Sequence, residues 1–394
     1  MTKVDRWLLP EGIEEILPNR AFVVENLRRT LLDFYHSWGY DLVIPPLVEF
    51  TDSLLSGGDK DLELLTFKVT DQLSGKTMGV RADVTPQTAR MDAHSLRRLG
   101  PNRLCYASTV LYTRPRNALA SRSPIQVGIE LYGVAGLEAD LEVISLLVES
   151  LSYGGVTGLC LDLGHVGIFR SLEEELALSP ALKAELFALL QAKSCDLDTW
   201  VAEHIDEPEL AKILTSLPNL SGDPAVLDTA RELFASAPAE VEAALDELQL
   251  VVDTLQQQFP DLQLYLDMGE LEGYHYHSGI VFAAYAANAR QALANGGRYD
   301  DVGESYGRAR PATGFSVDLK AVAELVSPEE LKPAGIYGEP SQSAEYRAFV
   351  AKLRAQGERV ILGFSGQVPD FDELGCDRRI VEDNQQFSVI QIQS

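Results

Sequence analysis

The chain has 394 residues, with 33 Lys and Arg against 59 Asp and Glu, which gives a formal net charge of −26. A hydrophobic content of 46% with 23% charged residues excludes extensive disorder. No run approaches the ~20 apolar residues that a membrane span requires. The acidic balance also counts against nucleic-acid binding, because phosphate backbones attract basic surfaces. We therefore expect a folded protein with neither a membrane nor a nucleic-acid partner.

The first part of the chain predicts a helix followed by pairs of strands. Apolar residues at helical spacing predict a helix over 21–38, ended by Gly39. The strand-like stretches are 40–44, 65–70, 76–82, 103–112 and 124–134. The turn residues Ser74 and Gly75 predict a hairpin between the second and third of these. A helix over 138–152 and a strand over 156–163 follow.

Residues 165–259 have helical periodicity and predict a mainly helical insertion. Ser171 and Glu174 have capping-box spacing, which predicts a helix start there. Strand patterns then return at 262–268, 279–286 and 311–317, with a glycine-rich link at 295–303. Because the helices are inserted between groups of strands, we expect an α+β fold with an antiparallel sheet.

The last part of the chain restarts after Pro333 with a helix over 343–356 and strands over 359–364 and 387–392. We therefore expect two domains, one over 1–325 and a small C-terminal α/β segment over 333–394. The chain has no P-loop and no G-x-S-x-G motif. Its cysteines lack C-x-x-C spacing, and the first 20 residues lack a signal-peptide pattern. We expect no metal, no cofactor and a cytosolic location.

Polar residues alternate with apolar ones in four segments, which are 80–85 (VRADVT), 125–130 (IQVGIE), 272–279 (EGYHYHSG) and 294–300 (ANGGRYD). Asp83, Gln126 and Glu130 are expected to be half-buried acceptors on a sheet face, where carboxylates need a partner. One interpretation is internal pairing with Arg81 or Arg298. The other is a pocket for a small cationic ligand, such as an ammonium group or an imidazole. His275 and His277 are expected on one strand face.

Taken together, these segments resemble the catalytic domain of class II histidyl-tRNA synthetases over roughly residues 8–325. LPEGIEEILP (9–18) resembles the N-terminal signature, and GYDLVIPPLVEF (39–50) resembles motif 1, through which these enzymes dimerise. VRADVT, QVGIE, EGYHYHSGIVF, ANGGRYD and TGFSV (313–317) follow in the family order. Each match is weak by itself, but their order is specific.

The resemblance implies a histidine-binding site. The matching positions are Asp83, Thr85, Gln126, Glu130, Tyr276 and His277. The first three correspond to residues that hold the histidine ammonium group, and Glu130 to the carboxylate that holds the imidazole. Tyr276 and His277 stand at a pair of tyrosines beside the imidazole. Asp83 replaces a longer Glu, and His277 replaces a Tyr.

The same resemblance implies that the synthetase reaction is lost. Leu111, Glu272 and Ala321 stand where the enzymes have arginines. Adenylate formation needs cations against the phosphates, and removing one such preorganised group costs ~3–4 kcal/mol of transition-state stabilisation. The tail is also too short and too acidic for an anticodon-binding domain. We therefore expect no catalytic residues in this chain.

This combination resembles the regulatory subunits of ATP phosphoribosyltransferase, which are non-catalytic paralogues of the synthetase. The resemblance implies that the chain binds and activates the short catalytic subunit, which performs the first step of histidine biosynthesis, and contributes to feedback regulation by histidine. It also implies a self-dimer through the motif 1 region and histidine as a ligand. Two alternatives stay open, a ligase that adenylates an amino acid for an acceptor other than tRNA, and a stand-alone histidine-sensing module.

Overall fold

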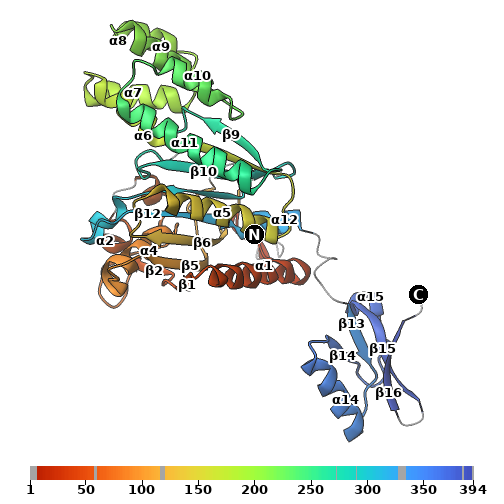
Figure 1. Cartoon of the computed structure of the whole chain (residues 1–394). Coiled ribbons are helices and arrows are strands. Elements are labelled where there is room, and N and C mark those ends of the chain that lie inside the picture. Colours follow the sequence, from red (N-terminus) through yellow and green to blue (C-terminus); the bar gives the residue numbers. More distant parts are fainter. Residues whose placement is uncertain are drawn as a thin grey trace. The chain divides into compact units, whose positions relative to one another are not determined.

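The computed structural model describes residues 7–56, 60–115, 120–271, 273–289, 291–326, 334–383 and 386–392. The described residues form two compact units (Figure 1). The larger unit takes in most of residues 7–326, and the smaller one includes residues 334–392. No described helix combines the length and the apolar composition that crossing a bilayer requires.

A nine-stranded sheet organises the larger unit. In spatial order its strands are β1 (Asp41–Leu42), β5 (Asn102–Thr109), β6 (Ile125–Tyr132), β12 (Ala312–Asp318), β11 (Ala294–Arg298), β10 (Ile280–Ala286), β7 (Leu159–His165), β9 (Gln263–Asp267) and β8 (Ser221–Gly222). Neighbouring strands are antiparallel except for β1 with β5 and β7 with β9. The predicted antiparallel sheet is therefore confirmed from β5 through β7, and its two ends add parallel pairs.

Helices pack on this sheet through apolar stripes. The long ones are α1 (Pro18–Ser37), α5 (Leu137–Tyr153) and α11 (Ala239–Gln258), and the short α12 (Leu319–Leu325) follows β12. Helix α5 contacts β6, β10 and β12, and its Val143, Leu146 and Leu147 are fully buried. The Tyr35 ring of α1 meets Phe315 of β12 with centroids 6.0 Å apart. Helix α1 matches the predicted helix, and Gly39 follows it with φ +86°.

A second, three-stranded antiparallel sheet is formed by residues that lie between β1 and β5 in the chain. It consists of β2 (Val48–Phe50), β4 (Thr77–Val80) and β3 (Phe67–Thr70), in that order. The predicted hairpin is confirmed as β3–β4, with Gly75 at φ +72° in the turn. Short helices lie beside it, namely α2 (Thr51–Leu54), α3 (Lys60–Leu65), α4 (Thr85–Arg90) and a π-helical turn at Met91–Leu96. The loop from β4 to α4 carries one of the candidate site segments.

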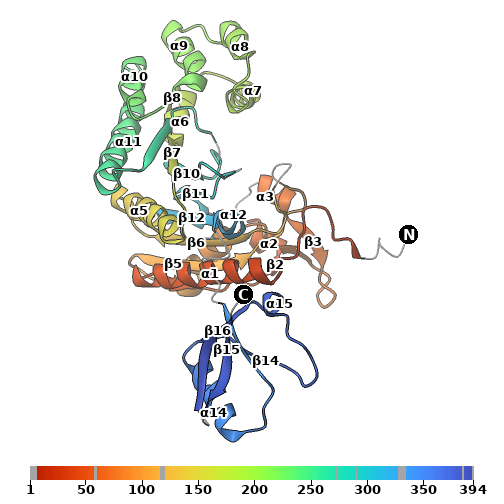
Figure 2. The same ribbon diagram turned by 90° about the vertical axis from the view of Figure 1, so that its right-hand side faces the viewer.

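The helical insertion lies at the end of the main sheet formed by β7, β9 and β8 (Figures 1 and 2). Besides α11 it contains α6 (Val166–Glu175), α7 (Pro180–Gln191), α8 (Leu197–His204), α9 (Pro208–Ser216) and α10 (Val226–Leu233). The predicted capping box is wrong, because Ser171 lies inside α6. The chain enters α6 directly from β7, and His165 Nδ1 accepts from the Gly167 N–H at 3.1 Å.

The smaller unit is an α/β fold. It contains β13 (Gly335–Gly338), α14 (Ala344–Ala355), β14 (Val360–Leu362), α15 (Phe371–Leu374), β15 (Cys376–Asp383) and β16 (Gln386–Gln391), with sheet order β14-β13-β15-β16. Its core includes Ile336, Val350 and Ile380. Sequence patterning missed β15, whose stretch CDRRIVED is mostly charged. Only Cys376 and Ile380 of this strand are buried, so its apolar signal is weak.

Two segments differ from the sequence expectation. The glycine-rich link at 295–303 begins as strand β11, in the middle of the main sheet. A Cβ at Gly296 would lie 2.4 Å from the Gly314 carbonyl oxygen, so glycine permits close packing of adjacent strands there. The segment after Leu271 turns instead of forming a strand, because the N–H groups of Tyr276 and His277 both donate to the Gly273 carbonyl at 2.8 Å.

Candidate functional site

Strand β6 positions Gln126 and Glu130 on one face, as the alternation of strand side chains predicts. Both side chains are buried. Gly128 lies between them, opposite Tyr106 of β5. A Cβ at Gly128 would come within 2.7 Å of the Tyr106 hydroxyl, so glycine leaves room for the ring. The local sequence QVGIE therefore permits an aromatic side chain to reach the buried acid.

Glu130 is the centre of a buried polar cluster. One oxygen of its carboxyl group accepts a hydrogen bond from the Tyr106 hydroxyl at 3.2 Å, and the other oxygen accepts one from the Tyr299 hydroxyl. The pKa of Glu130 is raised to about 8, mainly by burial of the carboxyl group and in addition by the charge of Asp83. Hydrogen bonds from Tyr299, Thr85 and Tyr106 oppose this increase in the pKa. The Glu130 carboxyl can therefore take up or release a proton near neutral pH.

The loop between β4 and α4 brings Asp83 to the same cluster, together with Thr85, the first residue of α4. The Val84 N–H donates to Asp83 Oδ1 at 2.7 Å and to Gln126 Oε1 at 3.2 Å. Asp83 and Gln126 therefore share a backbone donor, although they are distant in sequence. Asp83 is half-buried, but it lies in a loop and not on a sheet face as expected, because β4 ends at Val80.

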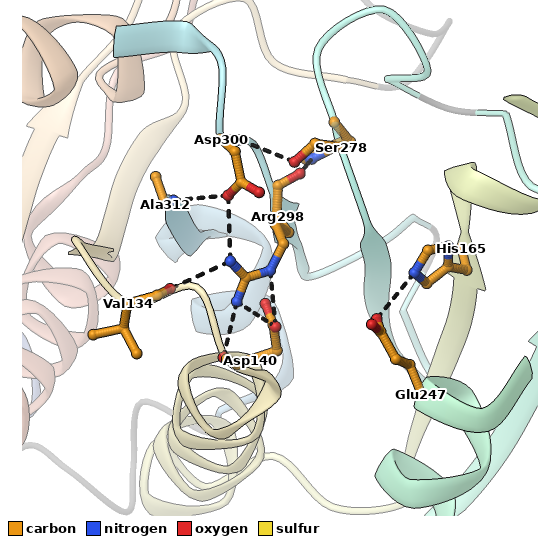
Figure 3. Close-up of polar contacts among 10 residues, drawn as sticks. Val134, Asp140, His165, Glu247, Ser278, Arg298, Asp300 and Ala312 are labelled. Carbon is orange, nitrogen blue, oxygen red and sulfur yellow. Dashed lines mark hydrogen bonds and ion pairs between the residues drawn. The ribbon is translucent and has the colours of Figure 1, made fainter. Parts of the chain in front are cut away.

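The two arginines that could have paired with these acceptors bind elsewhere. Arg81 donates to the carbonyls of Thr109 and Pro45, both at 2.9 Å. Arg298 is held by Asp140, with Nη2 to Oδ2 at 2.6 Å, and by Asp300 at 3.2 Å (Figure 3). In these contacts neither arginine pairs with Asp83, Gln126 or Glu130, which are the acceptors considered from the sequence. Arg298 instead ties β11 to the start of α5.

Tyr276 and His277 lie in the turn that precedes β10. The Tyr276 ring stacks on Tyr299 at 5.2 Å, and its buried hydroxyl has no hydrogen-bond partner among the described residues. His277 Nδ1 lies 3.2 Å from the Arg298 carbonyl oxygen, and burial lowers the pKa of His277 to about 4. His275 packs on Phe187 with ring centroids 5.2 Å apart. The two histidines do not share a strand face, because this segment is a turn.

Of the three positions that the resemblance assigns to synthetase arginines, two lie in the part of the chain that the structure describes. Leu111 is half-buried after β5, and its N–H donates to the Arg81 carbonyl at 3.1 Å. Ala321 lies in the first turn of α12, where its N–H donates to Asp318 Oδ1 at 3.4 Å. Glu272 lies outside the described residues, as does Arg116, one of three arginines (with Arg114 and Arg122) between β5 and β6 in the sequence.

Two cationic side chains near these positions, Lys320 and Arg122, contact the N-terminal segment that carries LPEGIEEILP (9–18). Lys320 Nζ lies 2.8 Å from Glu14 Oε1 and 3.2 Å from Ser123 Oγ. Arg122 donates to the carbonyls of Glu11 and Tyr112, each at 3.0 Å. Lys320 and Arg122 therefore bind the chain's own N-terminal residues. Arg114, which lies between β5 and β6, is exposed.

Sequence reasoning assigned no role to Tyr106 or Tyr299, although both contact Glu130. Tyr299 lies within the motif ANGGRYD, next to Arg298. Tyr106 is identified only by the register of β5 with β6, which sets it opposite Gly128. A glycine inside a strand signals a close approach, and that is the feature that could have revealed a bulky neighbour.

Comparison with known proteins accounts for both units. A family model described as histidyl-tRNA synthetase matches residues 12–322, and one described as ATP phosphoribosyltransferase subunit HisZ C-terminal domain matches 333–390. The curated ATP phosphoribosyltransferase regulatory subunit of Teredinibacter turnerae is 54% identical over 391 residues, covering 99% of each chain. That of Saccharophagus degradans is 52% identical over 393 residues, covering 100% of each.

A solved structure gives the same result for the fold. The crystal structure of an ATP phosphoribosyltransferase regulatory subunit/histidyl-tRNA synthetase from Bacillus halodurans superimposes with a TM-score of 0.82 and 26% identity. It covers 95% of this chain and 97% of its own. The expected class II synthetase-like fold is thereby confirmed. With relatives about half identical over their whole length, the chain belongs to the family of ATP phosphoribosyltransferase regulatory subunits.

Proposed function

We propose that this chain is a non-catalytic, cytoplasmic subunit that binds the short catalytic subunit of ATP phosphoribosyltransferase, activates it and transmits feedback by histidine. The observation that carries the proposal is the Glu130 cluster. It lies in a chain that is similar to regulatory subunits over its full length. The buried acid and its tyrosines support a histidine site, and the residues at the proposed arginine positions of the synthetase (Leu111, Glu272 and Ala321) carry no positive charge.

Histidine is the proposed ligand of this cluster. Its imidazole would meet Glu130 and Tyr276, whose buried hydroxyl lacks a partner among the described residues. Its ammonium group would meet Asp83, Thr85 and Gln126. A buried carboxyl is costly to ionise without a nearby cation, so a cationic ligand would be stabilised there. Asp83, Thr85 and Tyr276 retain partial exposure, which leaves a side for the ligand to approach.

Adenylate formation is not part of the proposed activity. Leu111 and Ala321 offer no charge at positions where the synthetase uses arginine, and Glu272 offers the opposite charge. The neighbouring Lys320 and Arg122 are held by the N-terminal segment. Since each missing preorganised group costs ~3–4 kcal/mol at the transition state, their combined loss is incompatible with useful turnover.

Self-association through the motif 1 region is the proposed basis of the assembly. This segment exposes a run of large apolar side chains, which are Leu42, Ile44, Leu47, Val48 and Phe50. Exposed apolar side chains that gather in one segment are typical of a protein-binding site. We propose that a second copy covers it, and that catalytic subunits join the resulting dimer.

The test is turnover of the catalytic subunit with and without this chain, across a range of histidine concentrations. We expect addition of the chain to raise the rate and to shift the histidine inhibition curve. The absence of both effects, together with the absence of a complex on a sizing column, would contradict the proposal. Histidine-dependent exchange of pyrophosphate into ATP by the chain alone would favour the ligase alternative instead.

Histidine binding is tested separately by calorimetry on the chain alone. Glu130→Gln and Tyr276→Phe are expected to weaken binding at least tenfold, because each removes one contact to the imidazole. Glu25→Gln on the exposed face of α1 is the matched control and should bind like the unaltered chain. Equal affinity in all these variants would exclude the Glu130 cluster as the site.

A further inference from the structure

The outer edge of the C-terminal sheet is an unprotected strand. β16 pairs with β15 on one side, and no described strand pairs with its other side. The edge strands of the main sheet, β1 and β8, and the other edge strand of the C-terminal sheet, β14, are all shorter than β16. β1 and β8 have two residues each, and β14 has three, whereas β16 has six. Long edge strands are templates for pairing, and proteins normally shorten them or protect them.

The composition of β16 adds nothing that would block pairing. Residues 386–392 (QFSVIQI) contain no charge, proline or glycine, whereas the adjacent β15 is mostly charged. Charged side chains and prolines are the usual protection of an exposed edge. Two copies of a chain with net charge −26 repel each other in general. At β16 they can meet without setting like charges opposite one another.

The register with β15 determines which backbone groups point outward. The Ile392 N–H donates to the Asp377 carbonyl at 2.7 Å, and hydrogen-bonded pairs alternate along an antiparallel ladder. Ser388 and Ile390 therefore direct their N–H and C=O groups toward β15. Phe387, Val389 and Gln391 direct theirs toward the free edge. The side chains of Phe387 and Val389 remain packed on the core of the unit.

We propose that β16 pairs antiparallel with β16 of a second copy, about a two-fold axis through Val389. In this register Val389 lies opposite Val389 of the second copy, and Phe387 lies opposite Gln391. Each of these hydrogen-bonded pairs exchanges both N–H···O=C bonds. All outward groups of β16 are then matched. The interface is isologous, joins two C-terminal sheets into one, and uses other residues than the motif 1 segment.

A second copy fits this edge better than an unrelated strand because the pattern is self-complementary. The outward residues are symmetric about Val389, and the core-facing side chains Phe387 and Val389 fall on the same face in both copies. On the opposite face, Ser388 of one copy lies across from Ile390 of the other. Both positions are exposed, so they can be altered without disturbing the core of the unit.

The first test compares the masses of full-length variants by analytical ultracentrifugation. S388K/I390K places like charges across the proposed axis, and S388K/I390E places opposite charges there. We expect S388K/I390K to sediment at half the mass of the unaltered chain, and S388K/I390E to keep the full mass. An unchanged mass for S388K/I390K, or a halved mass for both variants, overturns the proposal. Circular dichroism establishes that both variants are folded.

The second test fixes the register by disulfide formation in a Cys195→Ser background, because Cys195 is exposed. Chains with Ser388→Cys are mixed with chains with Ile390→Cys and oxidised. We expect crosslinked dimers in the mixture and much fewer in either variant alone. No crosslink in the mixture, or equal crosslinking in all three samples, contradicts the register. If S388K/I390K keeps its mass but loses the catalytic subunit, the edge belongs to that partner and the proposal is wrong.

Discussion

Glu130 shows how one buried side chain acquires its chemistry from its neighbours. Strand β6 removes the carboxyl group from water, and Tyr106 and Tyr299 supply hydroxyl donors. Desolvation outweighs these donors, so the pKa of Glu130 rises from 4.5 to about 8. At neutral pH the Glu130 carboxyl therefore favours its neutral form. Ligand binding and protonation of Glu130 are then linked.

The pH dependence of folding tests this assignment. Because the folded-state pKa of Glu130 lies above the ordinary value of 4.5, the folded chain holds a proton that the unfolded chain releases between about pH 4.5 and 8. Stability from this group is complete below that range and is lost as pH rises through it, by roughly 1.4 kcal/mol per unit of pH. We expect Glu130→Gln to reduce the decline, measured by denaturant unfolding at several pH values. Parallel declines in both proteins would refute the raised pKa.

The Arg298–Asp140 pair is the second feature at this scale. Both side chains are buried, and the guanidinium also donates to the carbonyls of Val134 and Gly136 (Figure 3). Asp140→Ala leaves the buried guanidinium without its main counter-charge. We expect a loss of about 3–5 kcal/mol in the free energy of unfolding. Glu25→Ala breaks two solvent-accessible ion pairs, with Arg28 and Arg29, and each should contribute only about 0–1 kcal/mol. Similar costs for both would show that burial of the pair is unimportant.

At the scale of elements, helix ends and hairpins were predictable because they depend on local chemistry. The end of α1 was predicted from Gly39, whose φ of +86° permits the chain to turn into β1. The start of α6 was not predicted, because the side chain that caps this helix is His165, which belongs to the preceding strand. Glycines in β11 were misinterpreted as a link because their packing against β12 and β10 is not local.

Gly39→Ala tests the contribution of the helix end. An added Cβ would meet no atom within 4 Å, so the only cost is the left-handed backbone, about 1–2 kcal/mol. Gly100→Ala is the matched control, because it also has open space and its φ is not positive. We expect denaturant unfolding to show a loss for Gly39→Ala alone. An equal effect of the two substitutions would exclude backbone strain as its origin.

At the scale of the whole molecule, the net charge of −26 sets the range of partners. Nucleic-acid affinity depends on neutralising phosphates with lysine and arginine, and Arg122 and Lys320 already have partners. We expect no retention of tRNA in filter binding at physiological salt, under conditions in which a histidyl-tRNA synthetase retains it. Saturable binding that weakens as salt increases would contradict this prediction.

The sequence by itself determined the fold class and the order of the synthetase-like motifs, because residue types at fixed spacing carry that information. The loss of synthetase arginines at positions 111, 272 and 321 stays a prediction. The domain boundary near 325–333 and the histidine-site residues remain predictions. Only the tertiary structure decided that Arg298 binds Asp140, that Tyr106 and Tyr299 bind Glu130, and that no described strand pairs with the outer side of β16. Each of these depends on strand register between distant segments, and register is set by packing across the sheet.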